Sequence, residues 1–229
     1  MSTAVAQQRG SVVVAWLRLL RLPNHATAVA DVLAGWLVIA RPESVAAPPA
    51  AFWAAAAASL LLYAAGMVLN DVFDRELDAV ERPERPLPRG LIAPATAAFV
   101  GWLTAAGGVA AGITAAVLSG HPAVAGVAAA LAAAVYLYDR HAKPTAAGPL
   151  VMGSCRSLNW LLGMTAAGGP NEAAEWLPVA GMGIYVGGIT LFARYEATLS
   201  SRRWLVMSTA VMVCGLAIAA GYTVWLVGQ

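Results

Sequence analysis

Six of the twelve acidic residues in this chain lie in one short segment, between Asp71 and Glu84. If the apolar helix before this segment continues through it, a turn of about 100° per residue places Asp71, Asp74 and Asp78 within roughly 60° of one another. Crowded carboxylates repel one another unless a cation joins them, and Mg²⁺ prefers such oxygen ligands and commonly bridges to substrate phosphates. The spacing therefore favours a metal–diphosphate site over the alternative, a solvated helix end whose acids pair with nearby arginines.

Seven apolar segments must position this cluster, near residues 22–40, 50–69, 91–118, 122–138, 148–168, 177–195 and 204–227. Most of them approach the roughly 20 residues that a helix needs to cross the hydrocarbon core of a bilayer. They are rich in Ala and Gly, which lets membrane helices pack closely, and they are too long and unbroken for barrel strands. We therefore predict an all-α, polytopic transmembrane bundle of about seven spans, formed by a single domain over residues 1–229.

The basic residues predict the orientation of this bundle. Twelve of the fourteen Lys and Arg residues lie before the first span or in the connections at 70–90, 139–147 and 194–203. Cytoplasmic loops of membrane proteins carry an excess of such residues. We expect a multi-pass protein of the inner (cytoplasmic) membrane, with its N-terminus and the aspartate cluster facing the cytoplasm, where phosphorylated metabolites occur.

The composition excludes several other classes of protein. The chain is 60% hydrophobic and only 11% charged, whereas soluble domains average about 25% charged residues. An ordinary soluble domain, a disordered chain and a nucleic-acid-binding module are therefore excluded, and a formal net charge of +2 is too small to suggest a polyanionic partner. Cys155 and Cys214 lie in apolar stretches without metal or disulfide spacing, so we expect them to be small core residues.

Two stretches carry the resemblance to a known family. The segment 70–90, which contains NDVFDRELD and then RPLPRG, resembles the first aspartate-rich motif of the UbiA-type intramembrane prenyltransferases. The segment 138–163, YDRHAKPTAAGPLVMGSCRSLNWLLG, resembles the EboC-like branch of the same superfamily. The likeness extends from the RLPN of residues 21–24 to Glu196, and so covers most of the chain.

This resemblance implies an Mg²⁺-dependent reaction. Family members bind an isoprenyl diphosphate through Mg²⁺ held by two aspartate motifs, and loss of the diphosphate leaves an allylic carbocation that alkylates an aromatic or lipid acceptor. The resemblance assigns assistance in metal binding to Asn70 and the grip on the diphosphate to Arg85 and Lys143. Arg140 is a further candidate, whose alternative role is to enforce topology. The metal-binding and catalytic residues that the resemblance implies are Asp71, Asp74 and Asp78, with Lys143.

The second half of the chain departs from the family pattern. A faint repeat at a spacing of 122 residues sets Asp74 against Glu196, within a degenerate second-motif region at 191–203. Glu196 is therefore a candidate metal ligand, or it pairs with Arg194 or Arg203. Two explanations compete for the arginines of this region: they bind the diphosphate directly in place of a metal, with Arg194 as a substrate-binding candidate, or the second metal site is lost together with transferase activity.

The length departs as well, because the family fold commonly has nine transmembrane helices. A second copy of the chain in a homodimer, or a smaller chamber, would have to compensate. Three functions stay open: a prenyltransferase, a terpene cyclase acting on an isoprenyl diphosphate, and a non-catalytic carrier or binder of a prenylated lipid. The expected partners are an isoprenyl diphosphate, a lipid or aromatic acceptor and membrane lipid, with no nucleic acid.

Two charged residues inside predicted spans, Asp31 and Arg156, are expected to meet. They lie about nine and eight residues from the cytoplasmic ends of their spans, so at 1.5 Å per residue their depths agree within a few ångströms. Each alone would cost roughly 2.5–3.5 kcal/mol on insertion, so we expect an ion pair or a polar cavity, with either a structural or a substrate-orienting role. Asn159, one turn beyond Arg156, shares both alternatives, and Asn24 is a candidate for lining the cavity.

Overall fold

The computed structural model describes residues 12–40, 42–196 and 202–228, and the regular structure of these residues is entirely helical. Residues 12–20 form a first helical segment, and the 3₁₀ turn η1 (Leu22–Asn24) connects it to α2. The long helices are α2 (His25–Ile39), α4 (Ala50–Phe73), α6 (Pro94–Ser119), α7 (Ala123–Leu137), α8 (Gly148–Ala166), α9 (Trp176–Glu196) and α10 (Arg202–Val227). The short elements are α3 (Pro42–Ala46), α5 (Arg75–Glu81), the π-helical turn η2 (Tyr138–Ala142) and the 3₁₀ turn η3 (Ala173–Glu175).

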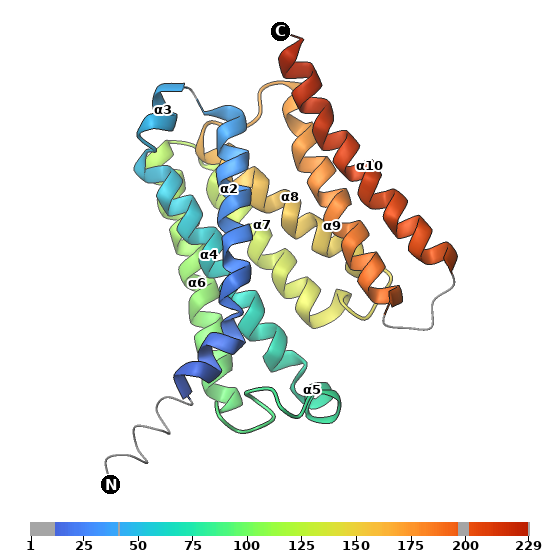
Figure 1. The fold of residues 1–229 in the computed structure, drawn as a ribbon. Helices are drawn as coiled ribbons and strands as arrows, with labels where there is room; N and C mark the ends of the chain where they lie inside the picture. Colours follow the sequence, from blue (N-terminus) through green and yellow to red (C-terminus); the bar gives the residue numbers. More distant parts are fainter. Residues whose placement is uncertain (1–11, 41, 197–201, 229) are drawn as a thin grey trace.

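The predicted all-α membrane bundle is confirmed. Six helical segments of the described chain are long and apolar enough to cross a membrane, by length and composition. The remaining predicted span is α8, which has 19 residues and is less apolar because it carries Arg156 and Asn159. The helices run up and down between two ends, so the segment 12–20 and the end of α10 lie at opposite ends of the bundle (Figure 1). The chain is thus an integral, multi-pass membrane protein.

Glycines let α2 and α8 approach until their backbones touch. A Cβ atom added to Gly35 would lie 2.1 Å from the carbonyl oxygen of Trp160, and one added to Gly163 would lie 2.0 Å from that of Val32. No side chain fits between two backbones at this separation. The close packing brings the middle of α2 level with the middle of α8, where both helices carry charged residues.

We expect Gly163→Ala to lower the free energy of unfolding by about 1–3 kcal/mol, because the new methyl group meets backbone atoms that have no free rotamer to adopt. The measurement is the thermal unfolding midpoint of the protein in detergent. Gly126→Ala on α7 is the matched control, since no atom of the described residues lies within 4 Å of a Cβ atom there, and it should not lower the midpoint. An unchanged midpoint for Gly163→Ala would contradict the close contact of α2 and α8.

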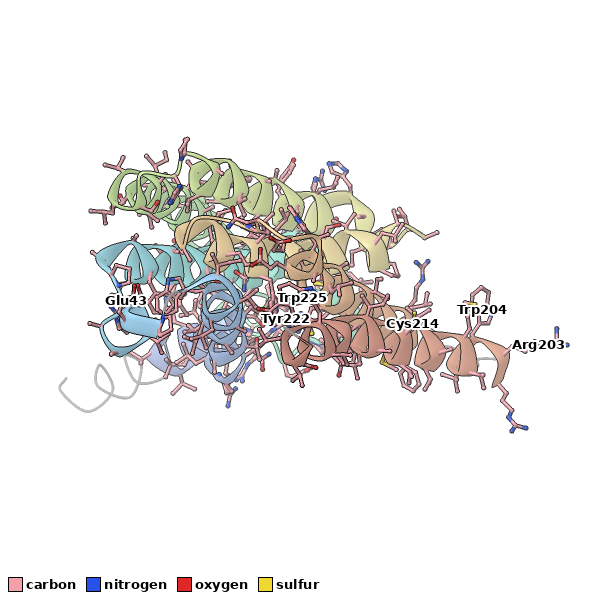
Figure 2. The ribbon with its side chains drawn as sticks, turned by 90° about the horizontal axis from the view of Figure 1, so that it is seen from above. Glu43, Arg203, Trp204, Cys214, Tyr222 and Trp225 are labelled. Carbon is pink, nitrogen blue, oxygen red and sulfur yellow. The ribbon has the colours of Figure 1, made fainter. Side chains whose placement is uncertain are left out.

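Helix α10 forms one edge of the bundle and packs against α9 (Figure 1). Its buried residues are Ser208 and Gly215, and the Tyr222 hydroxyl donates a hydrogen bond of 3.3 Å to the Val38 carbonyl of α2. Figure 2 shows Tyr222 at one end of α10 and Cys214 farther along the helix. Cys214 is exposed, so the expectation that it lies in the core is wrong, because α10 turns most of its surface away from the other helices.

Candidate functional site

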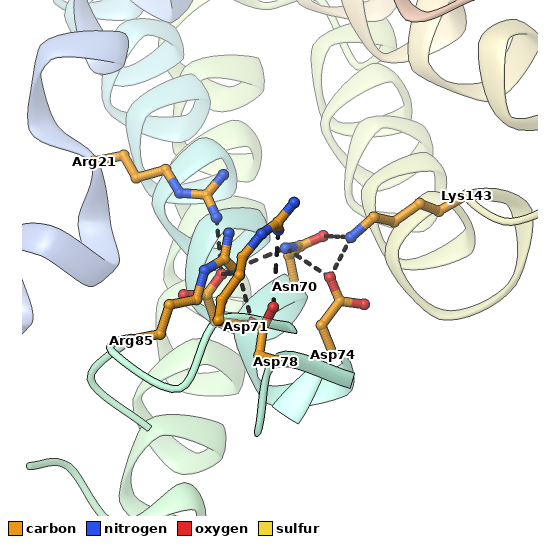
Figure 3. Close-up of polar contacts among 8 residues, drawn as sticks. Arg21, Asn70, Asp71, Asp74, Asp78, Arg85 and Lys143 are labelled. Atoms are coloured by element: carbon orange, nitrogen blue, oxygen red, sulfur yellow. Dashed lines mark hydrogen bonds and ion pairs between the residues drawn. The ribbon is translucent and has the colours of Figure 1, made fainter. Parts of the chain in front are cut away.

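A cluster of ion pairs lies where α4 ends and α5 begins (Figure 3). Its cations come from three other places: between the segment 12–20 and η1, in the loop after α5, and just after η2. Contacting residues are as far as 73 positions apart in the sequence. We call this set the aspartate–cation cluster, and its members are Arg21, Asn70, Asp71, Asp74, Asp78, Arg85 and Lys143.

Arg85 joins the two most buried carboxylates of the cluster. Its Nη1 lies 2.6 Å from Asp78 Oδ2 and 3.3 Å from Asp71 Oδ1. Asp71 also accepts a hydrogen bond of 2.9 Å from Arg21, and Asp78 has a longer ion pair of 3.8 Å with Arg82. The side chains of Asp71 and Asp78 are only 5% and 2% exposed, and carboxylates this buried need charged partners to remain ionised.

Lys143 lies on the other side of the cluster and contacts Asp74 and Asn70. Its ammonium group donates to Asp74 Oδ2 and, at 2.9 Å, to Asn70 Oδ1. The Asn70 amide nitrogen lies 3.3 Å from Asp74 Oδ2 and 3.4 Å from Asp71 Oδ1. Asn70 therefore links the half of the cluster held by Arg85 to the half held by Lys143.

The helix through the aspartate segment breaks at Asp74, so the continuous helix assumed in the sequence analysis is not present. Asp74 ends α4 with φ −83° and ψ 0°, and α5 starts at the next residue. Backbone hydrogen bonds of 2.9 Å from Asp74 to Asn70 and 2.8 Å from Asp78 to Asp74 carry the chain across the break. The aspartates stay on neighbouring turns, but they divide between Arg85 and Lys143 instead of facing one common partner.

Apolar contacts hold the loop that carries Arg85. Leu87 and Ile92 of this loop are 5% and 4% exposed, and they pack in one apolar group with Leu19 of the first helical segment and Val68 of α4. The RPLP sequence thus places a buried leucine two residues after the arginine. This anchor fixes the loop beside α4, where Arg85 can reach Asp71 and Asp78.

The oxygen atoms of this cluster suit Mg²⁺, although no group of three or more His, Cys, Asp and Glu residues in the described part of the chain is arranged to hold a metal ion by itself. Mg²⁺ is commonly bound through one or two carboxylates, with water and substrate phosphate oxygens completing its octahedron. The carboxylate oxygens of Asp71 and Asp74 both lie within hydrogen-bonding distance of the Asn70 amide nitrogen. The Asn70 side chain adds an amide oxygen of the kind that Mg²⁺ also binds. The residues present therefore fit a magnesium ion that is shared with a phosphate ligand.

A mostly apolar cavity of about 120 Å³ lies inside the bundle next to this cluster, between α2, α4, α7 and α8. Near the cluster its wall includes Gly66, one turn before Asn70, together with Tyr138 and Asp139. At its other end the wall includes Arg156 and Asn159. The cavity therefore connects the region of the aspartates with the charged residues in the middle of α2 and α8.

The predicted meeting of Asp31 and Arg156 is confirmed. Arg156 Nη1 donates to Asp31 Oδ2 in an ion pair between α8 and α2. Asn159 Nδ2 donates to the same oxygen at 3.1 Å and to the Ala28 carbonyl at 2.9 Å, while Trp160 Nε1 donates to Asp31 Oδ1 at 3.1 Å. The Asp31 carboxylate thus has three side-chain donors and is not an isolated charge.

Two other predicted substrate-binding cations lie outside the cluster. The Arg140 guanidinium lies over the ring of Phe73, with its Cζ atom 5.7 Å from the ring centroid. Arg194, near the end of α9, donates to the carbonyls of Pro144 and Thr145. These two residues directly follow Lys143 in the sequence. Arg194 therefore contacts the segment that carries Lys143, whereas the roles of both arginines in substrate binding stay predictions.

The last two predicted residues receive less support from their surroundings. Asn24 closes the turn η1 immediately before α2, and its carbonyl accepts a hydrogen bond of 2.7 Å from the Thr27 hydroxyl. Glu196 is the final residue of α9, and its side chain lies outside the described residues. Its role as a metal ligand, and its alternative pairing with Arg194 or Arg203, both stay predictions.

Two further residues, for which the sequence predicts no site role, also lie here. Arg21 contacts Asp71, and it is the one non-glycine residue of the described chain with a positive φ, at 49°. Such backbone strain is typical of positions that the surrounding structure over-determines. Asp139 lines the cavity with a buried Oδ2 atom that has no hydrogen-bond partner among the described residues. The sequence carried a signal for each residue. Arg21 begins the RLPN stretch, and Asp139 is a carboxylate at the end of an apolar span.

Known proteins share sequence features and fold with this chain. The model of the UbiA prenyltransferase family matches residues 28–228. A digeranylgeranylglyceryl phosphate synthase of Methanopyrus kandleri is 37% identical over 83 residues, which cover 36% of this chain and 29% of that protein. The synthase of Methanothrix thermoacetophila is 55% identical over 38 residues, covering 17% of this chain and 14% of the relative. The matched segments thus span less than a third of either relative.

One solved structure shows the same fold. It is described as giving structural and mechanistic insights into the biosynthesis of digeranylgeranylglyceryl phosphate synthase in membranes. It superimposes with a TM-score of 0.70 at 21% sequence identity, and the match covers 91% of this chain and 76% of that chain. The shared architecture therefore extends over nearly the whole of the present bundle.

Proposed function

Because the chain belongs to the UbiA prenyltransferase family, we propose that it transfers an isoprenyl group from a diphosphate donor to a lipid or aromatic acceptor. The observation that carries this proposal is the aspartate–cation cluster beside an apolar cavity. An isoprenyl diphosphate has a polyanionic end and a hydrocarbon end, and these two adjoining sites match the two ends of one molecule.

In this proposal the cations of the cluster bind the diphosphate. The side chains of Arg21, Arg85 and Lys143 are 35%, 21% and 35% exposed, and each is more exposed than the carboxylate it contacts. An incoming anion therefore meets the cations before the aspartates. Hydrogen bonds between such cations and phosphate oxygens are short and charge-assisted, which gives both affinity and orientation.

The proposed cofactor is Mg²⁺, held by Asn70, Asp71 and Asp74 directly or through water. When bound, it would supply neutralisation of the charge that develops on the departing diphosphate. Asp78 was predicted to share this role. Because its side chain is enclosed between Arg85 and Arg82, its proposed role is mainly to hold Arg85 in position.

The chemical step breaks the bond between the allylic carbon and the diphosphate oxygen, and the electron pair leaves with the diphosphate. The acceptor supplies the electron pair of the new bond to that carbon and then loses a proton. Water would capture the electrophilic carbon, so the reaction needs a chamber from which water is excluded. The mostly apolar wall of the cavity meets this requirement.

The degenerate second-motif region receives a positioning role in this proposal. Arg194 donates to the carbonyls of Pro144 and Thr145, and so it holds the segment next to Lys143. The proposed consequence is that Arg194 acts on the diphosphate through Lys143. The N-terminus and the cluster are proposed to face the cytoplasm, because the cluster lies at the end of the bundle that carries most of the basic residues.

The test of this proposal uses the full chain in proteoliposomes with labelled isoprenyl diphosphates of several lengths. We expect diphosphate release in Mg²⁺, and a decrease of roughly 100-fold or more when the metal is removed by chelation, because the departing charge is then unneutralised. Added Mg²⁺ should restore the rate. Absence of any isoprenyl diphosphate binding in Mg²⁺ would overturn the proposal.

The products of the same experiment separate the three functions. A prenylated acceptor supports the transferase. A cyclic hydrocarbon formed from the diphosphate without any acceptor indicates a terpene cyclase instead. Tight binding of an intact prenylated lipid without diphosphate release indicates a carrier, a function compatible with aspartates that are already paired with cations.

A further inference from the structure

The end of the cavity away from the aspartate–cation cluster, which we call the inner end, carries hydrogen-bonding groups that the proposed transfer does not use. Asn159 lines the cavity and is 7% exposed, and its Oδ1 atom is buried without a hydrogen-bond partner among the described residues. Arg156 lines the same wall, its side chain is 24% exposed, and in the described part of the chain it donates through Nη1 to Asp31. One acceptor atom and further guanidinium N–H groups are thus available to a ligand.

A purely structural ion pair does not account for these groups. Joining α2 to α8 requires the Asp31 carboxylate and its three donors, which are Arg156, Asn159 Nδ2 and Trp160. It does not require Asn159 Oδ1. A buried carbonyl oxygen without a partner costs about 1–3 kcal/mol, so an apolar cavity that ends on such an atom is poorly matched to a plain hydrocarbon chain.

The charges of the cavity wall disfavour an anionic ligand at this end. At this end the Asp31 carboxylate is paired with Arg156, and among the described residues no second cation lines the cavity. A phosphate or carboxylate would have to lose its water beside a cation whose charge the Asp31 carboxylate already balances. An uncharged group that both donates and accepts hydrogen bonds fits the available partners, and a hydroxyl group is the simplest such group.

We propose that the inner end of the cavity binds the hydroxyl group of an uncharged lipid alcohol, which donates to Asn159 Oδ1 and accepts from the Arg156 guanidinium. Ser59 Oγ and Asn159 Nδ2 both donate to the Ala28 carbonyl, so Asn159 lies level with Ser59, which precedes Asn70 on α4 by about 16 Å along the helix. A hydroxyl bound here is therefore too far from the cluster to be the prenylated group. This inference rests on the proposed function. It assigns to the acceptor a neutral hydroxyl group at the end opposite its reactive group.

The test is photo-crosslinking of the full chain in lipid nanodiscs, without Mg²⁺ or diphosphate. The probe is a dodecanol carrying a diazirine beside its hydroxyl group, and the competitors are dodecanol, dodecane and dodecanoate. We expect labelled peptides from α4 and α8, and a decrease of roughly tenfold with dodecanol only. Equal competition by dodecane, stronger competition by dodecanoate, or labelling confined to α6 and α10 would each overturn the inference.

A variant isolates the contribution of Asn159. Asn159→Leu retains the approximate volume and removes the amide, and roughly tenfold more dodecanol should then be needed to compete. Cys214→Ala is the control, because Cys214 is exposed on α10, and it should compete like the parent chain. If Asn159→Leu does not fold, the three competitors on the unmodified chain still decide. Because neither metal nor diphosphate is present, a failure of labelling would overturn the hydroxyl site and leave the proposed function standing. Labelling of a chain that shows no turnover in proteoliposomes would overturn the transferase and leave the hydroxyl site standing.

Discussion

Lys143→Met is expected to lower the rate of isoprenyl diphosphate consumption by about 100- to 1,000-fold, the effect of removing one preorganised charge from a leaving-group site. Lys143 is the single cation on its side of the cluster among the described residues, and it contacts both Asp74 and Asn70. Methionine has a similar length and no charge. The variant would leave Asp74 without its cation and the diphosphate without one of its three proposed partners.

Arg75→Gln is the matched control for this experiment. Arg75 belongs to the same segment, but it is 53% exposed and pairs at 3.5 Å with Glu76, which is 88% exposed. Exposed pairs of this kind contribute little to stability, and the rate should stay close to that of the parent chain. A rate for Lys143→Met within threefold of the control, with binding of the diphosphate unchanged, would remove Lys143 from the proposed site. Lys143→Arg should retain binding better than Lys143→Met, because it keeps the charge in a different geometry.

Arg156→Met is expected to lower the free energy of unfolding by about 3–5 kcal/mol, because it leaves the Asp31 carboxylate buried without its cation. The Asp31 side chain is only 9% exposed, between two helices in backbone contact. The thermal unfolding midpoint in detergent measures this loss. The double variant Asp31→Leu with Arg156→Met should recover much of it, since it removes both charges together.

The double-mutant cycle separates this pair from a general effect of altering α8. If Asp31 and Arg156 interact, the summed losses of unfolding free energy in the two single variants exceed the loss in the double variant by about 0.5–3 kcal/mol. Additive losses would show that the two residues stabilise the protein independently. Glu76→Gln serves as the control, because this side chain is 88% exposed and its replacement should leave the midpoint unchanged.

The helical architecture was predictable from the sequence because membrane insertion depends on local properties. A run of about 20 apolar residues, bounded by charges, satisfies the bilayer wherever it occurs in a chain. The predicted span at 148–168 agrees with α8 within two residues, although Arg156 and Asn159 make this helix less apolar than the six spans that meet the hydropathy criterion. The meeting of Asp31 and Arg156 was predictable for a related reason: depth in a membrane follows directly from position in a span.

The membership of the cluster was predictable only in part. The NDVFDRELD segment indicated the aspartates, and the resemblance pointed to Arg85 and Lys143. Arg21 received no site role, because its contact with Asp71 depends on a left-handed backbone conformation and on the packing of a distant segment. The break of the helix at Asp74 was also missed, since no Gly or Pro in the sequence marks it.

The sequence by itself thus determined the class of the protein, the depth of its buried charges and the chemical type of its site. The tertiary structure decided which cation contacts which aspartate: Arg85 holds Asp71 and Asp78, and Lys143 holds Asp74. It also decided that the cavity ends on an amide oxygen that has no hydrogen-bond partner among the described residues. Hydropathy and helical periodicity act within a segment, whereas these pairings join residues up to 69 positions apart in the sequence, and they depend on how the helices pack.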